Sequence, residues 1–155
     1  MYLKSKSYDI EGGNVMEKVK RKNVFVDGSR NGRVCVDLGY DDGYTIQKIL
    51  DPSNLLHKIT QGEIEFLAII KAIELIDSGN YNILSDAKNI ISLINDDNRK
   101  SYTKKWMRHK VQRLNRLLKI RTDLDLKFIW IPRELNRAGL RLDGINPNLS
   151  HYLEL

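Results

Sequence analysis

Val24-Phe25-Val26-Asp27-Gly28-Ser29 is a short apolar run that ends in an acid and a turn. Consecutive residues of high β propensity, with no polar residue alternating among them, predict a strand that is buried on both faces. An acid at the end of such a strand is costly to bury unless a partner compensates its charge. This stretch therefore predicts a central strand that carries Asp27 to a functional site.

Residues 23–50 have the pattern of three short strands separated by turns. The strand-like runs lie at 23–27, 33–40 and 44–50, and the segments between them contain Asn31-Gly32 and Asp42-Gly43. Asn-Gly and Asp-Gly pairs are the strongest short-range signals for a β-hairpin. We therefore expect an antiparallel meander.

The rest of the chain alternates helix and strand patterns. Thr60 and Glu63 form a capping-box pattern that predicts a helix over 62–78. On this helix Glu65 lies on the apolar stripe, and Glu63 and Ile70 fall on the opposite side. The further predicted elements are a strand at 81–85, a short helix at 87–95, a basic helix at 103–120, a strand at 126–131 and a final helix after Pro132. This order predicts an α/β fold in which a mixed sheet, three meander strands and two parallel ones, carries helices on both faces.

Length and composition are those of one globular domain. The chain has 155 residues, of which 41% are apolar, and this is enough for a sizeable core. Residues 1–22 show no sustained hydrophobic period and are interpreted as a loosely ordered arm, which leaves 23–155 for the domain. Neither a membrane-spanning run nor a secretory leader pattern is found, and this predicts a cytoplasmic protein.

Three acids occupy unusual positions: Asp27 and Asp86 each end an apolar strand, and Glu65 lies on the apolar side of its helix. The first and fourth strands of the predicted sheet can be neighbours, so the three carboxylates would converge. Each acid also has a structural explanation: an Asp-Gly turn for Asp27, the helix dipole for Glu65 and a helix cap for Asp86. Taken together, these three explanations account for the positions of the acids less well than a shared divalent metal ion does. Cys35 is the sole cysteine and the histidines are scattered, which leaves an oxygen-ligated ion such as Mg²⁺ or Mn²⁺.

Positive charge is concentrated in one segment. The net charge is +6, and ten basic residues without an acid lie from Arg99 to Arg121, whereas the remaining chain carries 16 basic and 20 acidic residues. On the basic helix, Trp106, Lys110 and Arg113 form a stripe beside the apolar core stripe. These cations either face solvent or bind phosphates, and their concentration favours a polyanionic partner.

Four motifs, taken in order, resemble those of type 1 ribonuclease H. They are Val24-Phe25-Val26-Asp27-Gly28-Ser29, Thr60-Gln61-Gly62-Glu63-Ile64-Glu65, Leu84-Ser85-Asp86-Ala87 and Trp130-Ile131-Pro132-Arg133-Glu134-Leu135-Asn136. The resemblance implies a ribonuclease H fold with a five-stranded sheet. It also implies an endonuclease that cuts the RNA strand of RNA/DNA hybrids and leaves 5′-phosphate and 3′-hydroxyl ends. Its cofactors would be two Mg²⁺ or Mn²⁺ ions, with Asp27 bridging both and with Glu65 and Asp86 dividing the remaining positions.

The resemblance further implies contacts with nucleic acid. Glu65 and the backbone at Gly28 and Ser29 would meet the 2′-hydroxyl, the group that distinguishes RNA from DNA. Arg133 would contact the scissile phosphate or, alternatively, pair with Glu134 at the surface. The other predicted substrate contacts are Thr60, Gln61, Lys105, Trp106, Lys110, Arg113 and Asn136. No obligatory protein partner is expected, so the chain is expected to act as a monomer.

One position departs from the family pattern. The family carries a fourth acid eight residues after the proline of the last motif, and Leu140 occupies that position here. Asp143 lies three residues further on, near the same helix face. It would bind the second ion directly or through water, or it would be a solvated acid near the end of the chain. We include Asp143 as the fourth candidate catalytic and metal-binding residue.

Two other functions remain open. The first is a weak or inactive relative that binds hybrid or double-stranded nucleic acid through the basic helix. The second is another nuclease on the same fold, such as a DNA resolvase. The motif at 60–65 favours the hybrid-cutting branch over this second alternative.

Overall fold

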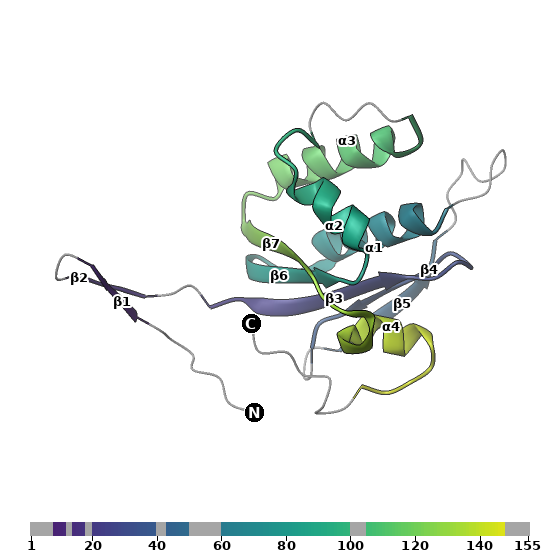
Figure 1. The fold of residues 1–155 in the computed structure, drawn as a ribbon, viewed down its shortest axis with the longest axis horizontal. Coiled ribbons are helices and arrows are strands. Elements are labelled where there is room, and N and C mark those ends of the chain that lie inside the picture. The colour runs from purple at the N-terminus through teal and green to yellow at the C-terminus, as the bar shows by residue number, and fades with distance from the viewer. Residues whose placement is uncertain are drawn as a thin grey trace.

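A mixed sheet forms the centre of the computed structural model (Figure 1). Its strands are β3 (Lys22–Gly28), β4 (Arg33–Asp37), β5 (Tyr44–Lys48), β6 (Gly79–Ser85) and β7 (Leu124–Trp130). These five strands lie in the order β5-β4-β3-β6-β7, which confirms the predicted fold class and makes β3 the central strand. The structure describes residues 8–11, 14–17, 20–39, 43–49, 60–99 and 105–147, with the backbone alone at 8–11, 14–17 and 105–106.

The strands β3, β4 and β5 form the predicted antiparallel meander. Asp27 of β3 pairs with Cys35 of β4, and Cys35 pairs with Ile46 of β5. The turn after β3 is closed by a hydrogen bond from Gly32 N to Ser29 O (3.0 Å). Gly32 has a φ of 82°, a conformation that glycine adopts without steric cost. The tight turn ends β3 just beyond Asp27.

The strands β3, β6 and β7 run parallel to one another. Val24 of β3 pairs with Ile83 of β6, and Ile83 pairs with Phe128 of β7. Parallel neighbours need crossover connections, which here contain helices. Because the carboxyl ends of parallel strands lie at the same edge of a sheet, β3 and β6 bring Asp27 and Asp86 to one edge.

Helices cover both faces of the sheet, as predicted. They are α1 (Gln61–Leu75), α2 (Lys88–Asn95), α3 (Lys105–Ile120) and α4 (Arg137–Leu142). The first three lie on one face and α4 lies on the other (Figure 1). The larger core centres on α1, where Ile64 and Phe66 are fully buried, and a smaller core beneath α4 contains Leu84 and Ala138. Among the described helices, none has the length and hydropathy needed to cross a membrane.

The helix α1 is buried on more sides than the sequence pattern predicts. Glu63 and Ile70, expected on the side away from the core, are only 2% and 1% exposed. The reason is α3, which packs against α1 on the side remote from the sheet. Glu63 keeps its capping box with Thr60 and also accepts a hydrogen bond from Lys110 Nζ of α3 (2.9 Å).

The final helix follows Pro132, as predicted, after a short 3-10 turn. Arg133–Leu135 form a single 3-10 turn, and α4 begins only at Arg137. Asn136 is the N-cap of α4, and its Oδ1 accepts a hydrogen bond from Ala138 N (3.1 Å). The cap that Asn136 provides therefore marks where α4 begins.

A buried group of charges holds α4 on the sheet. Asp37, at the end of β4, is 0% exposed, and its carboxylate accepts hydrogen bonds from Arg137 Nε and Arg141 Nε, each 3.1 Å long. Arg33 Nη2 of β4 donates to Leu142 O at the last turn of α4 (2.6 Å). The placement of α4 near Asp27 therefore depends on contacts with β4.

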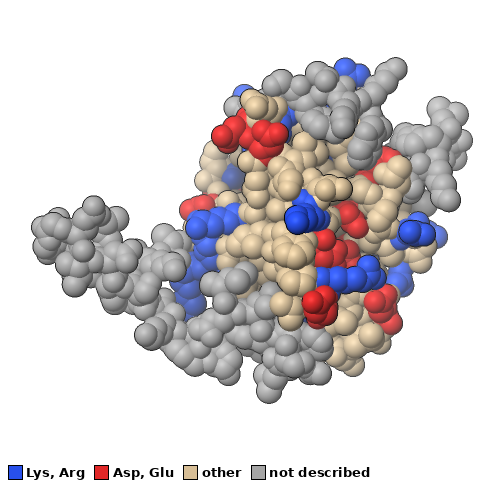
Figure 2. Space-filling model, in the orientation of Figure 1, with Lys and Arg blue, Asp and Glu red and all other residues tan. Residues whose placement is uncertain are grey.

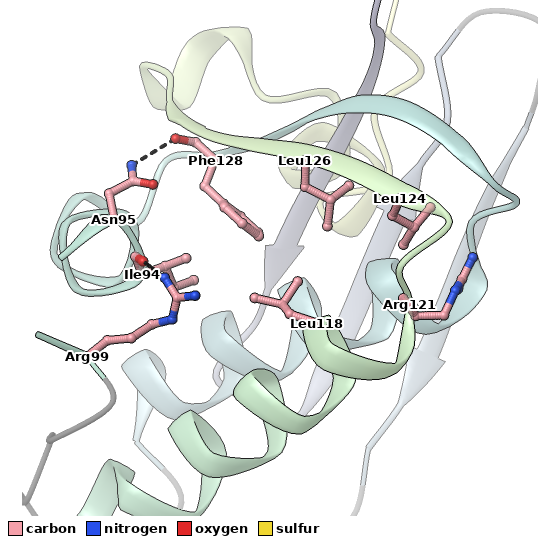
Figure 3. Close-up of a pocket in the computed structure, with 8 residues that line it drawn as sticks. All are labelled: Ile94, Asn95, Arg99, Leu118, Arg121, Leu124, Leu126 and Phe128. Carbon is pink, nitrogen blue, oxygen red and sulfur yellow. Dashed lines mark hydrogen bonds between the residues drawn. The ribbon is translucent and has the colours of Figure 1, made fainter. Parts of the chain in front are cut away.

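A pocket of about 370 Å³ lies where α2 and α3 meet the edge strand β7 (Figure 3). Its lining residues are Ile94, Asn95, Arg99, Leu118, Arg121, Leu124, Leu126 and Phe128. Arg99 Nη1 donates to Ile94 O (2.6 Å), and Arg121 Nη1 donates to Ile73 O (2.8 Å). None of the lining residues is a predicted site residue, and both arginines join neighbouring elements, so we assign this region to packing.

The N-terminal segment, whose sequence pattern predicts a loosely ordered arm, contains a hairpin. The strands β1 (Tyr8–Glu11) and β2 (Asn14–Glu17) pair antiparallel as a separate two-stranded sheet. Gly12-Gly13 stands between them in the sequence, a dipeptide that is typical of tight hairpins. The expected division into an arm and a domain at residues 22 and 23 stays a prediction.

Candidate metal centre

Asp27 lies near the end of the central strand β3. Val24, Phe25 and Val26 before it are buried, and β4 and β6 flank the strand on its two sides. The carboxylate of Asp27 is partly buried. Because the backbone of β3 is held by neighbours on both sides, the direction of this side chain is set by the sheet.

Gly28 lets the helix α1 approach the end of β3. A methyl group on Gly28 would overlap Ile64 Cγ2 and would lie 2.9 Å from both the carbonyl carbon and the carbonyl oxygen of Ile64. Only glycine leaves room for this contact, which brings Glu65 of α1 to Asp27. Gln61 Nε2 strengthens it by donating hydrogen bonds to Gly28 O (2.6 Å) and to Glu65 Oε1 (3.1 Å).

Asp86 directly follows β6 and is held from two sides. Its backbone oxygen accepts a hydrogen bond from Trp130 Nε1 (3.2 Å), and its Oδ2 accepts one from Asn136 Nδ2 (3.3 Å). Asn136 Nδ2 also donates to Val26 O of β3 (3.0 Å), so Asn136 joins the ends of β3 and β6. Asp86 does not cap the following helix, because the N-cap of α2 is Ala87, which excludes the helix-cap explanation for this acid.

The structure brings the carboxylates of Asp27, Glu65 and Asp86 together. One oxygen atom of each acid lies within 4.8 Å of one from each of the others. Mg²⁺ and Mn²⁺ prefer carboxylate oxygens, and three negative charges at this spacing repel one another unless a cation lies between them. The chemistry and the spacing of these donors therefore fit a divalent ion.

The protein surroundings compensate this charge only in part. Burial, followed by the charge of Asp86, raises the pKa of Asp27 from 3.8 to about 7. Burial likewise raises the pKa of Glu65 and of Asp86. Arg133 acts in the opposite direction, since its guanidinium lowers the pKa of all three carboxyls. Acidic and basic side chains lie next to each other on the face of the molecule shown in Figure 2.

The metal-free protein is expected to lose stability as the pH rises from about 4 to about 7. In this range the unfolded chain gives up the Asp27 proton first, because its pKa there is near 3.8, whereas the folded protein holds the proton until the pH approaches about 7. The unfolded state is therefore increasingly favoured until both states are ionised. Urea unfolding in EDTA at about pH 5 and about pH 7.5 measures the difference, which Asp27→Asn should reduce.

Asp97→Asn is the matched control for this measurement. Asp97 is an exposed acid outside the carboxylate centre, so this variant should keep the pH dependence of the wild type. Mg²⁺ added at about pH 7.5 should restore stability, since a cation bound by the folded state compensates the ionised acids. An unchanged pH dependence in Asp27→Asn would contradict the assignment of this effect to Asp27.

The structure does not place Asp143 with the other acids. Asp143 is the exposed C-cap of α4, and the acidic cluster found among the described residues contains Asp27, Glu65 and Asp86 alone. The residue of α4 that faces Asp27 is Gly139, where a methyl group would lie 2.9 Å from Asp27 Oδ2. Neither Gly139 nor Leu140 offers a carboxylate, so among the described residues α4 contributes no acid to the cluster.

Three other predicted substrate residues have structural tasks. Ser29 bonds to Asn31 Oδ1 within its turn, Thr60 caps α1, and Asn136 is a fully buried cap of α4. Asn136 influences the centre by holding the carboxylate of Asp86, and it does not itself lie on the surface of the centre. Contacts of these residues with a substrate stay predictions.

Two predicted cations of α3 are paired with acids of α1. Lys110 Nζ lies 2.9 Å from Glu63 Oε2, and its side chain is only 12% exposed. Arg113 Nη2 lies 2.9 Å from Glu74 Oε2, in a pair that solvent reaches. Lys110 is therefore a packing residue in this structure. The side chains of Lys105 and Trp106, which were also predicted to bind substrate, lie outside the described part of the chain.

Sequence reasoning missed two residues that shape the centre. Trp130 holds the backbone of Asp86 although its side chain is 44% exposed, and Lys88 Nζ lies 5.6 Å from the centre of its ring. A large aromatic residue next to the Pro-Arg-Glu motif is a signal that could have identified it. Gly139 had no such signal, since its importance depends on where α4 begins.

Comparison with known proteins identifies the fold. No family model matches the sequence, and no curated protein matches it. LC11-RNase H1, isolated from compost and solved in complex with an RNA/DNA hybrid, has a TM-score of 0.55 at 18% identity, covering 75% of this chain and 88% of that one. RNase H1 from Halobacterium salinarum has a TM-score of 0.55 at 20% identity, covering 81% of this chain and 99% of that one. The N-terminal RNase H domain of Rv2228c from Mycobacterium tuberculosis has a TM-score of 0.56 at 15% identity, covering 81% and 91%. The sheet order, the helices on both faces and these likenesses show that the chain has the ribonuclease H fold.

Proposed function

We propose that this protein is an endoribonuclease that hydrolyses the RNA strand of RNA/DNA hybrids and leaves 5′-phosphate and 3′-hydroxyl ends. The observation that carries the proposal is the cluster of Asp27, Glu65 and Asp86 within 4.8 Å at the ends of β3 and β6. The structurally similar LC11-RNase H1 is solved in complex with an RNA/DNA hybrid, which supports this substrate class for the present chain. We further propose that the protein acts in the cytoplasm as a monomer.

The chemistry would depend on Mg²⁺ or Mn²⁺ held by Asp27, Glu65 and Asp86. Divalent ions at this position would supply Lewis acidity, which activates a water molecule at neutral pH and stabilises the negative charge on the leaving 3′-oxygen. Gln61 orients the carboxylate of Glu65, and Asn136 orients that of Asp86. Such supporting hydrogen bonds keep the ligands in place and avoid reorganisation during the reaction.

Recognition of the RNA strand would involve residues on both sides of the acids. Arg133 is exposed and lies close enough to lower the pKa of all three carboxyls, so it is placed to attract a scissile phosphate. The backbone at Gly28 and Ser29 follows Asp27 directly and would meet the 2′-hydroxyl of the same nucleotide. A DNA strand in this position lacks that group, which provides the preference for RNA.

The exposed cations of α3 would bind the phosphate backbone of the substrate. Arg116 and Lys119 are exposed, and the Arg113 side chain is 47% exposed despite its pair with Glu74. Phosphate contacts of this kind position a duplex without reading its sequence. The structure therefore supports a smaller set of phosphate-binding residues on α3 than its total charge predicts, because Lys110 is engaged by Glu63.

The proposal predicts cleavage that depends on Asp27. The protein is incubated with labelled RNA/DNA hybrid, double-stranded RNA and branched DNA, each with Mg²⁺ or Mn²⁺. Only the RNA strand of the hybrid should be cut. Asp27→Asn should abolish cleavage because it removes the charge of the central ligand, and it should leave binding by the cations of α3 intact.

The exposed Asp97 again provides the control, since Asp97→Asn removes a carboxylate away from the centre and should cut the hybrid like the wild type. Preferred cleavage of branched DNA or double-stranded RNA would contradict the proposed substrate. Full activity of Asp27→Asn would contradict the proposed centre.

A second function is favoured by Gly139. This residue stands beside Asp27 without a carboxylate, and Leu140 occupies the position of the family's fourth acid. A centre with three acids is consistent with a protein that binds hybrid or double-stranded nucleic acid through α3 and cuts it weakly or not at all. Tight hybrid binding without cleavage in either metal would support this function over the first.

A further inference from the structure

Trp130 places an apolar ring beside the carboxylate centre. It is the last residue of β7, the edge strand next to β6, and it is 44% exposed. Its Nε1 donates to Asp86 O (3.2 Å), so the direction of the indole is fixed by the residue that carries one of the three acids. Single exposed aromatic residues are common on protein surfaces and need no function. The neighbours of this ring therefore decide its interpretation.

Lys88 brings a cation to the same ring. It is exposed, and its Nζ lies 5.6 Å from the ring centre, within the range at which an indole attracts an ammonium group. Lys88 is also the first residue of α2, where a positive charge opposes the helix dipole. The salt bridges between described residues involve other cations. The ammonium is thus held close to Asp86 and stays accessible to an anion from solvent.

The ring and the cation lie along the sheet edge that carries the acids. Neighbouring strands are about 4.8 Å apart, so the end of β7 lies about 5 Å from that of β6 and about 10 Å from that of β3. In the order β3-β6-β7, Gly28 and Ser29 stand on one side of Asp86 and Trp130 stands on the other (Figure 1). A nucleic-acid strand whose scissile phosphate lies at the centre extends past both sides.

We propose that Trp130 and Lys88 form a further contact for the RNA strand. In this contact the indole packs against the ribose of a nucleotide near the scissile phosphate, and the Lys88 ammonium binds a phosphate attached to that ribose. The carbon face of a sugar is accessible in a duplex, whereas the bases are paired and stacked. Such a contact positions the strand without reading its sequence. The inference rests on the proposed function for the identity of the ligand, and it adds a role for Trp130 beyond its support of Asp86.

Two substitutions of Trp130 isolate the ring. Binding of a short labelled RNA/DNA hybrid is measured in EDTA, so that the hybrid is not cut. Trp130→Phe and Trp130→Ala both lose the Nε1 donor to Asp86, and the difference between them therefore reports the ring. Trp130→Phe should bind the hybrid within about twofold of the wild type, whereas Trp130→Ala should bind it about fivefold more weakly.

The salt dependence of binding tests the cation. Lys88→Gln should reduce the slope of the logarithm of the binding constant against the logarithm of the salt concentration by about 0.9, the change expected for one lost phosphate contact. Lys127→Gln is the matched control, because Lys127 is an exposed lysine of β7 that lies three residues before the carboxyl end of the strand. It should keep the wild-type slope. An unchanged slope in Lys88→Gln would overturn the assignment of this lysine.

The fluorescence of Trp130 reports the contact directly. The chain has two tryptophans, so Trp106→Phe leaves Trp130 as the sole one. When this variant binds the hybrid in EDTA, the emission of Trp130 should shift and should lose most of its quenching by acrylamide. This measurement keeps Trp130 in place, so it decides even if Trp130→Ala fails to fold.

Each outcome supports or overturns the inference. Equal hybrid affinity of Trp130→Phe and Trp130→Ala would overturn it, and slow cleavage in both with wild-type binding would show that Trp130 only positions Asp86. A shielded Trp130 in a protein that binds hybrid without cutting it would keep the inference and remove the proposed hydrolysis. Cleavage of hybrid by a protein whose bound complex leaves Trp130 open to acrylamide would overturn the inference and keep the hydrolysis.

Discussion

Gly28→Ala is expected to lower the free energy of unfolding by about 1–3 kcal/mol and to weaken Mn²⁺ binding by about tenfold or more. The new methyl group would meet the carbonyl carbon and oxygen of Ile64 at 2.9 Å. These are backbone atoms, so the first turns of α1 must move away from β3. Glu65 follows Ile64 directly and would move with it, which separates one ligand from Asp27. Hybrid cleavage should fall further than metal affinity, because catalysis is more sensitive to small displacements.

Gly144→Ala is the matched control for this substitution. Gly144 has a φ of 76° with no atom within 4 Å of an added methyl group, so the change costs about 1 kcal/mol of backbone strain without moving a neighbour. Both variants are measured by urea unfolding, Mn²⁺ calorimetry and hybrid cleavage. Gly144→Ala should lose stability but keep its metal affinity, whereas Gly28→Ala should lose both. Wild-type metal affinity in Gly28→Ala would show that the close approach of α1 does not position Glu65.

Short-range patterns were sufficient to predict the sheet. The Asn31-Gly32 turn and the apolar run at 24–26 predicted a meander with β3 in a central position, and the structure has this arrangement. The backbone geometry of a strand or helix sets which side chains are buried, so it leaves a hydrophobic period in the sequence that can be detected. The convergence of the acids at the strand ends could be predicted in the same way, because parallel strands place their carboxyl ends at one edge of the sheet.

The rest of the centre could not be predicted because it depends on tertiary contacts. Glu63 looked exposed in the helical pattern, and only the packing of α3 explains why it is buried against Lys110. The residue of α4 that faces Asp27 is Gly139, and α4 begins after the 3-10 turn that follows Pro132. A one-residue shift on a helix turns a side chain by about 100°, so counting along the sequence cannot settle such a position.

Asp37→Asn is expected to destabilise the protein by about 3–5 kcal/mol, because it removes the buried carboxylate charge that the buried Arg137 and the partly buried Arg141 share. Asp37 is 0% exposed and accepts from Arg137 Nε and Arg141 Nε, whose side chains are 3% and 18% exposed. Urea unfolding measures the loss. Glu74→Gln is the matched control, since it neutralises an acid whose pair with Arg113 is largely exposed, and it should cost less than about 1 kcal/mol. A loss of similar size in both variants would contradict the importance of burial.

A triple variant separates the cost of buried charge from the anchoring of α4. Asp37→Leu combined with Arg137→Met and Arg141→Met removes the three charges of the two Asp37 ion pairs at once. The stability of this variant should return to near that of the wild type, because a buried ion pair replaced by apolar residues is often neutral. The Mn²⁺ affinity of the triple variant should recover less than its stability does. Arg141 also stacks on Tyr44, 4.1 Å from the ring centre, so its planar group helps to orient α4 against the meander. A methionine side chain has no planar group to stack on the ring, so it would orient α4 less precisely. Asn136, the cap of α4, would then hold Asp86 less firmly. Recovered stability with weaker Mn²⁺ binding is therefore the expected result, and it would show that these buried charges serve the geometry of the centre more than the stability of the fold.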